Sequence, residues 1–126
     1  LKYPNGISMS PDGKILYVAD FQGAFIRAYD VAADGKVSNP RKHCEVKNPD
    51  GFKVDAAGRI WTSTDHGLAV FGPDGKPAGT VDFEGMATNC AFGDADGKTL
   101  VITARRFVYK VRLKEPGIVP AARISK

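Results

Sequence analysis

Apolar residues in this chain occur in short runs that are separated by clusters of glycine, proline and aspartate. The runs are rich in Val, Ile, Tyr, Phe and Thr, and none of them keeps a helical period over several turns, which is typical of an all-β protein. The turns SPDGK, DFQG and ADGK each contain a glycine that adopts positive φ at low cost. The expected strands are 7–10, 15–20, 24–31, 37–46, 52–54, 60–64, 68–71, 79–83, 90–92, 100–104, 108–113 and, weakly, 121–124.

These strands fall into three repeated groups. The segments NGISMSPDGKILYVAD, DGFKVDAAGRIWTSTD and TNCAFGDADGKTLVITAR share one order of strand, turn and strand, and they begin at residues 5, 50 and 88. Units of four antiparallel strands at a spacing of about 40 residues are typical of the blades of a β-propeller. We therefore expect one partial propeller domain over 1–126, with blades at about 5–47, 48–85 and 86–126. A β-sandwich is the alternative, but it does not require its units to repeat.

The chain contains fewer blades than a closed propeller needs. A propeller usually has four to eight blades, and about three are present here. Three blades alone would leave the flanks of the first and third without the neighbour that buries them. We expect either that the chain is half of a longer, six-bladed protein or that a second copy closes the ring.

Composition excludes several classes of protein. The 126 residues are 43% hydrophobic and 25% charged, as in an ordinary globular domain. The net charge of +4 comes from scattered basic residues, so nucleic acid is not an expected partner. No apolar run reaches the length of a membrane span, and no signal-peptide pattern opens the chain. The compartment stays open, with the cytoplasm favoured over the periplasm. Cys44 and Cys90 form no CxxC pattern and are expected to be buried free thiols.

Propeller geometry assigns a place to the middle Pro-Asp-Gly sequence, which does not lie between two strands of one hairpin. If the innermost strand of each blade starts at one face of the ring, Asn5, Asp50 and Thr88 lie at the mouth of the central channel. Carboxylate and amide oxygens are hard ligands that suit Ca²⁺, Mg²⁺ or Mn²⁺. The alternative is that Asn5 and Asp50 merely favour tight turns before glycine.

The repeated segments resemble a known family. YPNGISMSPDGKILYVAD, KNPDGFKVDAAGRIW and ATNCAFGDADGKTLVITA are similar, in order and spacing, to the C-terminal half of the gluconolactonase and regucalcin (senescence marker protein) family of six-bladed propellers. GKVSNPRKHCEV matches the outer strand of that family between the first two motifs. The resemblance covers the chain through Leu113 and implies hydrolysis of sugar lactones.

The resemblance also implies a site. The family holds one divalent metal ion in the channel mouth, and its asparagine and aspartate ligands fall on Asn5 and Asp50. Ca²⁺ is the preferred ion, with Zn²⁺, Mg²⁺ and Mn²⁺ as alternatives. Asp50 is also the candidate catalytic residue, as the general base or as the group that positions the attacking water. The glutamate ligand and the substrate-binding arginine and asparagine of the family lie in its N-terminal half. This chain alone is therefore expected to have little or no activity.

Two further residues, His66 and Arg105, fall on loops at the same face as Asp50 and are candidate contacts for a polyhydroxy substrate. The simpler interpretation is that both are solvated loop residues. The sequence is also consistent with two other functions. One is a non-catalytic propeller that binds a partner on its loop face, and the other is phosphotriester hydrolysis. Serine-esterase chemistry has no support, because the chain lacks a Gly-x-Ser-x-Gly elbow.

Overall fold

The computed structural model describes residues 1–118 and shows eleven strands and no helix there. The strands are β1 (Pro4–Met9), β2 (Ile15–Asp20), β3 (Phe25–Val31), β4 (Val37–Glu45), β5 (Phe52–Val54), β6 (Ile60–Thr64), β7 (Gly67–Phe71), β8 (Pro77–Asp82), β9 (Ala87–Gly93), β10 (Thr99–Ala104) and β11 (Phe107–Arg112). They confirm the all-β prediction, with boundaries that shift by up to three residues. The described residues include no helix long and apolar enough to span a membrane.

Residues 1–118 form three antiparallel sheets, one for each sequence repeat. The first has the order β1-β2-β3-β4, the second β5-β6-β7-β8 and the third β11-β10-β9. The third sheet has three strands, and the expected fourth strand at 121–124 lies outside the described residues. The four-stranded unit is thus present in the first two repeats.

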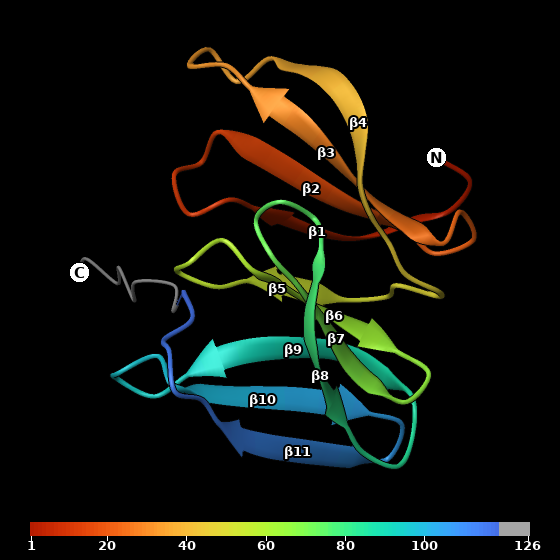
Figure 1. The fold of residues 1–126 in the computed structure, drawn as a ribbon, viewed down its shortest axis with the longest axis vertical. Coiled ribbons are helices and arrows are strands. Elements are labelled where there is room, and N and C mark those ends of the chain that lie inside the picture. The colour runs from red at the N-terminus through yellow and green to blue at the C-terminus, as the bar shows by residue number, and fades with distance from the viewer. Residues whose placement is uncertain (119–126) are drawn as a thin grey trace, which may run out of the picture.

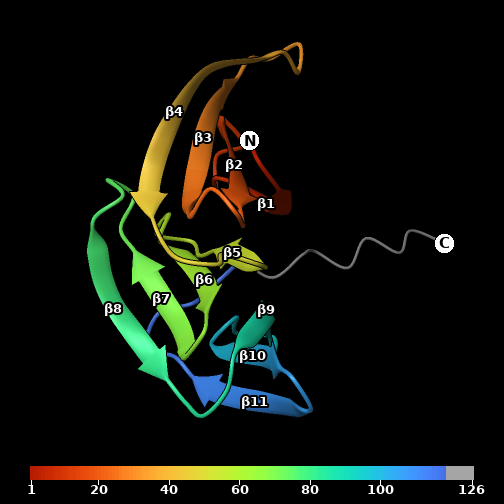
Figure 2. The same ribbon diagram turned by 90° about the vertical axis from the view of Figure 1, so that its right-hand side faces the viewer.

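The sheets stand side by side with their first strands together. β1, β5 and β9 run in the same direction in Figure 1, and β5 contacts both of the others. Figure 2 looks toward the ends from which these three strands start and shows the sheets fanning outward to β4, β8 and β11. β1, β5 and β9 are called the inner strands below, and the end at which they start is called the mouth.

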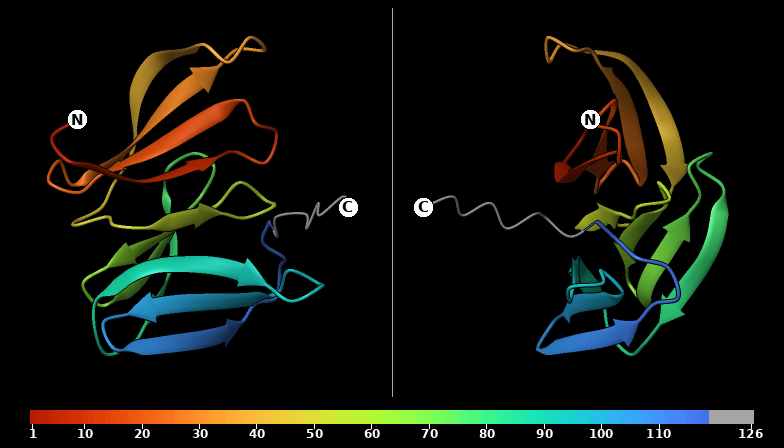
Figure 3. Two further views of the ribbon diagram at one scale, coloured as in Figure 1. Left: turned by 180° about the vertical axis from the view of Figure 1, so that it is seen from behind. Right: turned by 90° about the vertical axis from the view of Figure 1, so that its left-hand side faces the viewer.

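Four turns at the far end share one local feature, a hydrogen bond that a backbone N–H donates to the carboxylate of the aspartate two residues earlier. The carboxylates of Asp12, Asp34, Asp74 and Asp96 each accept from the N–H of the lysine two residues later. The β1–β2, β5–β6 and β9–β10 turns face the viewer in the right-hand panel of Figure 3. The hairpin turns that contain Asp12, Asp34, Asp74 and Asp96 therefore lie away from the mouth, as the repeat predicts, whereas the Pro-Asp-Gly sequence at 49–51 leads into β5 at the mouth.

Two apolar layers hold the three sheets together. Between the first and second sheets pack Tyr17, Ala19, Ile26, Ala28, Cys44, Phe52, Val54, Ile60 and Phe71. Between the second and third pack Trp61, Leu68, Val70, Ala87, Cys90, Phe92, Leu100 and Ile102. Full burial of one such aliphatic or aromatic side chain contributes about 1.5–3 kcal/mol. The second sheet contributes to both layers, so it is the centre of the structure.

The burial pattern along β6 reflects this central position. Its first four residues are all buried, because alternate side chains pack against the first and the third sheet. The first sheet, in contrast, is covered on one face only. Ile7 pairs with Val18 and Met9 with Leu16, on the face away from the second sheet, and Ile7 is 62% exposed.

A buried carboxylate organises the β5–β6 turn. Asp55 is 1% exposed and accepts hydrogen bonds from the N–H groups of Ala57 and Arg59. Its other oxygen accepts from Arg59 Nε at 2.6 Å and from Trp61 Nε1 at 2.9 Å. The turn therefore connects to the apolar layer that contains the Trp61 ring.

Replacing Asp55 with Ala should destabilise the protein by about 3–5 kcal/mol, because it leaves a buried indole N–H and the guanidinium without their acceptor. Urea unfolding followed by tryptophan fluorescence would measure the change. Asp74→Ala is the matched control, since Asp74 makes the same turn contact from an exposed position and should cost much less. Equal losses in the two variants would contradict this role for Asp55.

The two cysteine thiols are buried and free. Burial raises the pKa of Cys44 to about 12 and the pKa of Cys90 to about 11. Because the thiolate is the reactive form, neither residue should react with a chromogenic disulfide reagent at about pH 8 in the folded protein. Both should react fully once the protein is unfolded in guanidinium chloride. Rapid labelling of a native thiol would show that the apolar layers open readily.

Candidate functional site

Asn5 and Asp50, the two residues singled out as metal ligands by the sequence, lie together at the mouth. Asn5 is in β1, and Asp50 is in the loop that leads into β5. Both line a hollow of about 280 Å³ between the starts of the inner strands. They also share the wall of a neighbouring hollow with Tyr3 and Phe21. The structure therefore brings this predicted pair into one place.

The backbones of the inner strands meet here directly. The N–H of Gly6 donates to the carbonyl oxygen of Asp50 at 2.9 Å, and the N–H of Gly51 donates to that of Thr88 at 2.7 Å. A Cβ atom on Gly6 would overlap the Asp50 carbonyl oxygen, and one on Gly51 would overlap the Asn89 side chain. Neither glycine has positive φ. Glycine thus follows Asn5 and Asp50 because neighbouring strands approach closely there, and not because the chain turns tightly.

The Asp50 backbone is fixed by a residue of the second sheet. Its N–H donates to the hydroxyl oxygen of Ser63 at 2.9 Å, and Ser63 is fully buried in β6. The carboxylate accepts no hydrogen bond from residues 1–118, although Asp50 is half-buried. A positioned carboxylate with free lone pairs is the arrangement that a metal ion or a water molecule requires.

In the third inner strand, the residue at the repeated position does not line the hollow. Thr88 is equivalent to Asn5 and Asp50, but its hydroxyl contacts the Thr103 hydroxyl at 2.9 Å. The neighbouring Asn89 lines the hollow instead, together with Lys53 of β5. Neither residue occupies the position that the repeat marks. The sequence signal lies in the letters TNC, where Asn89 follows Thr88 directly, and in DGFK, where Lys53 comes three residues after Asp50.

The donor set agrees in kind with a hard divalent cation. Asn5 and Asp50 offer one amide and two carboxylate oxygens, which are the ligand types of Ca²⁺ and Mg²⁺ sites. Their number is too small, since Ca²⁺ takes six to eight oxygen ligands. Within the part of the chain that the structure describes, no group of three or more His, Cys, Asp or Glu side chains converges. Asn5 and Asp50 therefore offer the ligand types of such a site, but not the number of ligands that it needs.

His66, the first of the two candidate substrate contacts, is exposed in the β6–β7 turn. Its N–H donates to the Thr64 hydroxyl at 3.3 Å, and its carbonyl oxygen accepts from Phe83. The residue lies at the mouth end of the second sheet, but it does not line the hollow that holds Asp50.

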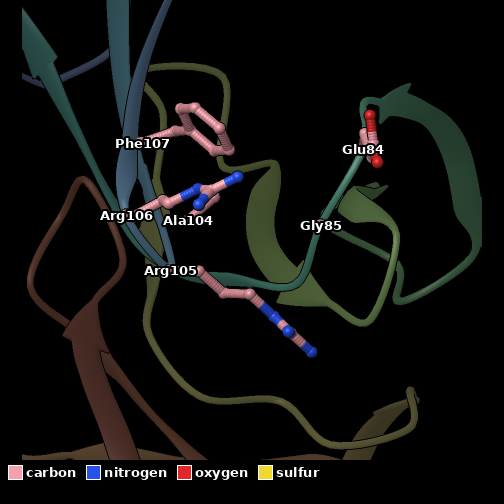
Figure 4. A pocket seen from close by; sticks show the side chains of 6 residues that line it. All are labelled: Glu84, Gly85, Ala104, Arg105, Arg106 and Phe107. Atoms are coloured by element: carbon pink, nitrogen blue, oxygen red, sulfur yellow. The ribbon is translucent and has the colours of Figure 1, made fainter.

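Arg105, the second candidate, lines a different hollow of about 410 Å³ with Glu84, Gly85, Arg106 and Phe107. Figure 4 shows Arg106 between the Phe107 ring and Arg105, whose guanidinium extends away from that ring. Arg105 has a φ of 50° in the β10–β11 turn and is exposed. The structure thus places both candidates at the mouth end without joining either of them to Asn5 and Asp50.

Asp20 has a structural role at the mouth. It is fully buried and accepts hydrogen bonds from the N–H groups of Lys2, Tyr3 and Gly23 at 2.6–2.9 Å. Desolvation opposes ionisation of this carboxyl, but the three N–H donors outweigh it and lower the pKa. Its stabilising effect is present above the ordinary carboxyl pKa and is lost as the pH falls through the lowered value. Asp20 holds the segment that leads into β1 and thereby Asn5.

The chain matches known proteins over most of its length. The family model of the SMP-30/gluconolactonase/LRE-like region matches residues 1–106. A gluconolactonase of Zymomonas mobilis is 33% identical in an alignment of length 131 that covers 93% of this chain and 36% of that protein. The structure of a gluconolactonase from Xanthomonas campestris superposes with a TM-score of 0.82 at 36% identity, covering 90% of this chain and 38% of that one.

A calcium-binding protein, regucalcin, from Agrobacterium tumefaciens shares the fold, with a TM-score of 0.78 at 20% identity over 93% of this chain and 50% of that one. The chain spans about a third of the length of the curated relatives that it matches. The family model covers far more than half of the 126 residues. The chain therefore belongs to the SMP-30/gluconolactonase/LRE-like family.

Proposed function

We propose that this chain supplies half of the active site of a metal-dependent hydrolase of sugar lactones. The observation that carries the proposal is that Asn5 and Asp50 line one hollow and that the Asp50 carboxylate accepts no hydrogen bond from residues 1–118. The gluconolactonase relatives support the choice of a lactone as substrate.

Asn5 and Asp50 would hold one divalent ion through the amide oxygen and a carboxylate oxygen. Ca²⁺ is our preferred ion, because both ligands are hard oxygens and, among residues 1–118, neither a thiolate nor an imidazole lines the hollow. Zn²⁺, Mg²⁺ and Mn²⁺ are the alternatives. When bound, such an ion supplies Lewis-acid polarisation of the lactone carbonyl.

Asp50 has a second role in this proposal. A carboxylate oxygen at the edge of the hollow accepts a proton from a water molecule as the water oxygen attacks the carbonyl carbon. The ring C–O bond then breaks, and the leaving oxygen takes a proton to become a hydroxyl group. Water is consumed, and the product is an open-chain hydroxy acid. The Ser63 hydrogen bond holds the Asp50 backbone in place while the proton moves.

His66 and Arg105 are proposed as outer contacts of the sugar. Both are exposed on turns at the mouth end, and their side chains carry the donors that bind hydroxyl groups. Their separation from the Asp50 hollow favours contact with the distal part of a substrate over a part in the chemical step.

The remaining ligands require polypeptide beyond this chain. We propose that the three sheets are half of a six-bladed propeller whose other half lies on the same polypeptide or, failing that, on a second copy. The apolar outer face of the first sheet supports this arrangement, because Ile7 and Met9 are exposed there and a further blade would bury them. This chain by itself should have little or no activity.

Replacing Asp50 with Asn in the full-length protein should lower metal affinity by about tenfold or more and kcat by about 10²- to 10⁴-fold. The amide keeps the shape of the side chain and removes its charge and its basicity. Isothermal calorimetry with Ca²⁺ and initial rates on gluconolactone measure the two effects. Asp34→Asn, in an exposed turn at the far end, is the matched control. Unchanged metal affinity in the Asp50 variant would eliminate the proposed metal site.

A lactone should also be the better substrate by a wide margin. Parallel assays on gluconolactone and on an organophosphate triester should give a much larger kcat/KM for the lactone. A preference for the triester would reassign the same site to phosphotriester hydrolysis. Metal binding without turnover of either compound would favour a non-catalytic binding module.

A further inference from the structure

Lys53 places a positive charge in the hollow that holds Asp50. The residue lies in β5, and its ammonium donates to the carbonyl oxygen of Phe52 at 3.0 Å. The adjacent carbonyl, that of Gly51, accepts from Ser63 N–H and thus points toward β6. Because successive carbonyls of a strand point to opposite edges, the Phe52 oxygen points to the unpaired edge of β5. The ammonium therefore lies on the inner edge of the second sheet.

Asn89 of β9 completes this side of the hollow. Its Oδ1 accepts from the Cys90 N–H at 2.9 Å and from the Lys53 ammonium at 3.4 Å. Both partners are donors, so the oxygen of the amide is turned toward them and its NH₂ group is turned away. Within residues 1–118 that NH₂ group donates to no acceptor, and Asn89 is exposed. It remains available to a ligand.

No carboxylate among residues 1–118 forms an ion pair with Lys53. Among the ion pairs of the described residues, none includes Lys53, and Asp50 lies beyond ion-pairing distance although it lines the same hollow. Lys53 is half-buried, so solvent screens its charge less than it screens that of a surface lysine. The hollow thus presents an acceptor, Asp50, and a cation, Lys53, to the same small volume.

We propose that Lys53, with the NH₂ group of Asn89, binds the carboxylate of the hydroxy-acid product. This inference rests on the proposed lactone hydrolysis. The lactone is neutral, and its hydrolysis converts the ester carbonyl carbon into a carboxylate while one proton is released. Negative charge therefore appears next to the atom that water attacks. An ammonium group with three donors stabilises that charge as a point cation.

The test compares an anionic ligand with a neutral one of the same length. Gluconate and glucitol carry similar hydroxyl groups, but only gluconate has the carboxylate. In the metal-loaded full-length protein, Lys53→Met should weaken gluconate binding by about 10- to 100-fold and leave glucitol binding nearly unchanged. Lys53→Arg should retain most of the gluconate affinity. Lys36→Met, an exposed lysine in the β3–β4 turn, should change neither.

Metal affinity provides the second measurement. The Lys53→Met variant should bind Ca²⁺ at least as tightly as the wild type, because a cation near the ion is removed. This result separates loss of a product contact from collapse of the hollow, which would lower metal affinity. If Lys53→Met proves unstable, Lys53→Gln removes the same charge and keeps a polar end group, and it should likewise weaken gluconate binding without weakening glucitol binding.

Two outcomes would overturn the inference, and they are distinguishable. If the wild type hydrolyses gluconolactone but Lys53→Met binds gluconate equally well, Lys53 does not contact the carboxylate, and the proposed function stands. If the wild type neither hydrolyses the lactone nor binds gluconate, the proposed function fails and this inference fails with it.

Discussion

The close approach of the three inner strands at the mouth is the constraint on which the site depends. Two backbone hydrogen bonds cross between sheets there, from Gly6 to Asp50 and from Gly51 to Thr88. Any side chain larger than hydrogen at either glycine would push the sheets apart. Asn5, Asp50 and Asn89 flank these contacts, so the bonds that align the sheets also set the spacing of the polar groups in the hollow. The same hydrogen bonds therefore stabilise the fold and position the candidate site residues.

The second sheet makes the largest contribution both to the packing and to the hollow. It packs on both faces, it supplies Lys53, and its buried Ser63 holds the backbone of Asp50 in the loop that leads into β5. Side chains held between two apolar layers have little freedom to move, which is the property that a precise site requires. The first and third sheets are each packed on one side, and they contribute Asn5 and Asn89 from their inner edges. The central sheet thus provides the rigid reference for residues from both neighbours.

The hollow combines a carboxylate, that of Asp50, with a cation, the ammonium of Lys53. The Asp50 carboxylate accepts no hydrogen bond from residues 1–118, and Lys53 of β5 and Asn89 of β9 line the same hollow. Other aspartates near the mouth already accept hydrogen bonds that hold the local structure. Asp20, for example, accepts three backbone N–H groups and is fully buried. The distinction between a structural and an available carboxylate lies in the number of donors that already reach it.

The sequence alone determined the strands, the three repeats, the far-end turns and the meeting of Asn5 with Asp50, because these follow from local hydrophobic periodicity and from equivalent positions in a repeat. Only the tertiary structure decided which neighbours share the hollow. Thr88 occupies the repeated position, but its hydroxyl turns to Thr103, and Asn89 takes its place. Lys53 reaches the inner edge through its long side chain, and Arg105 lines a separate hollow. Such choices depend on the distance between sheets and on side-chain direction, which no single strand specifies.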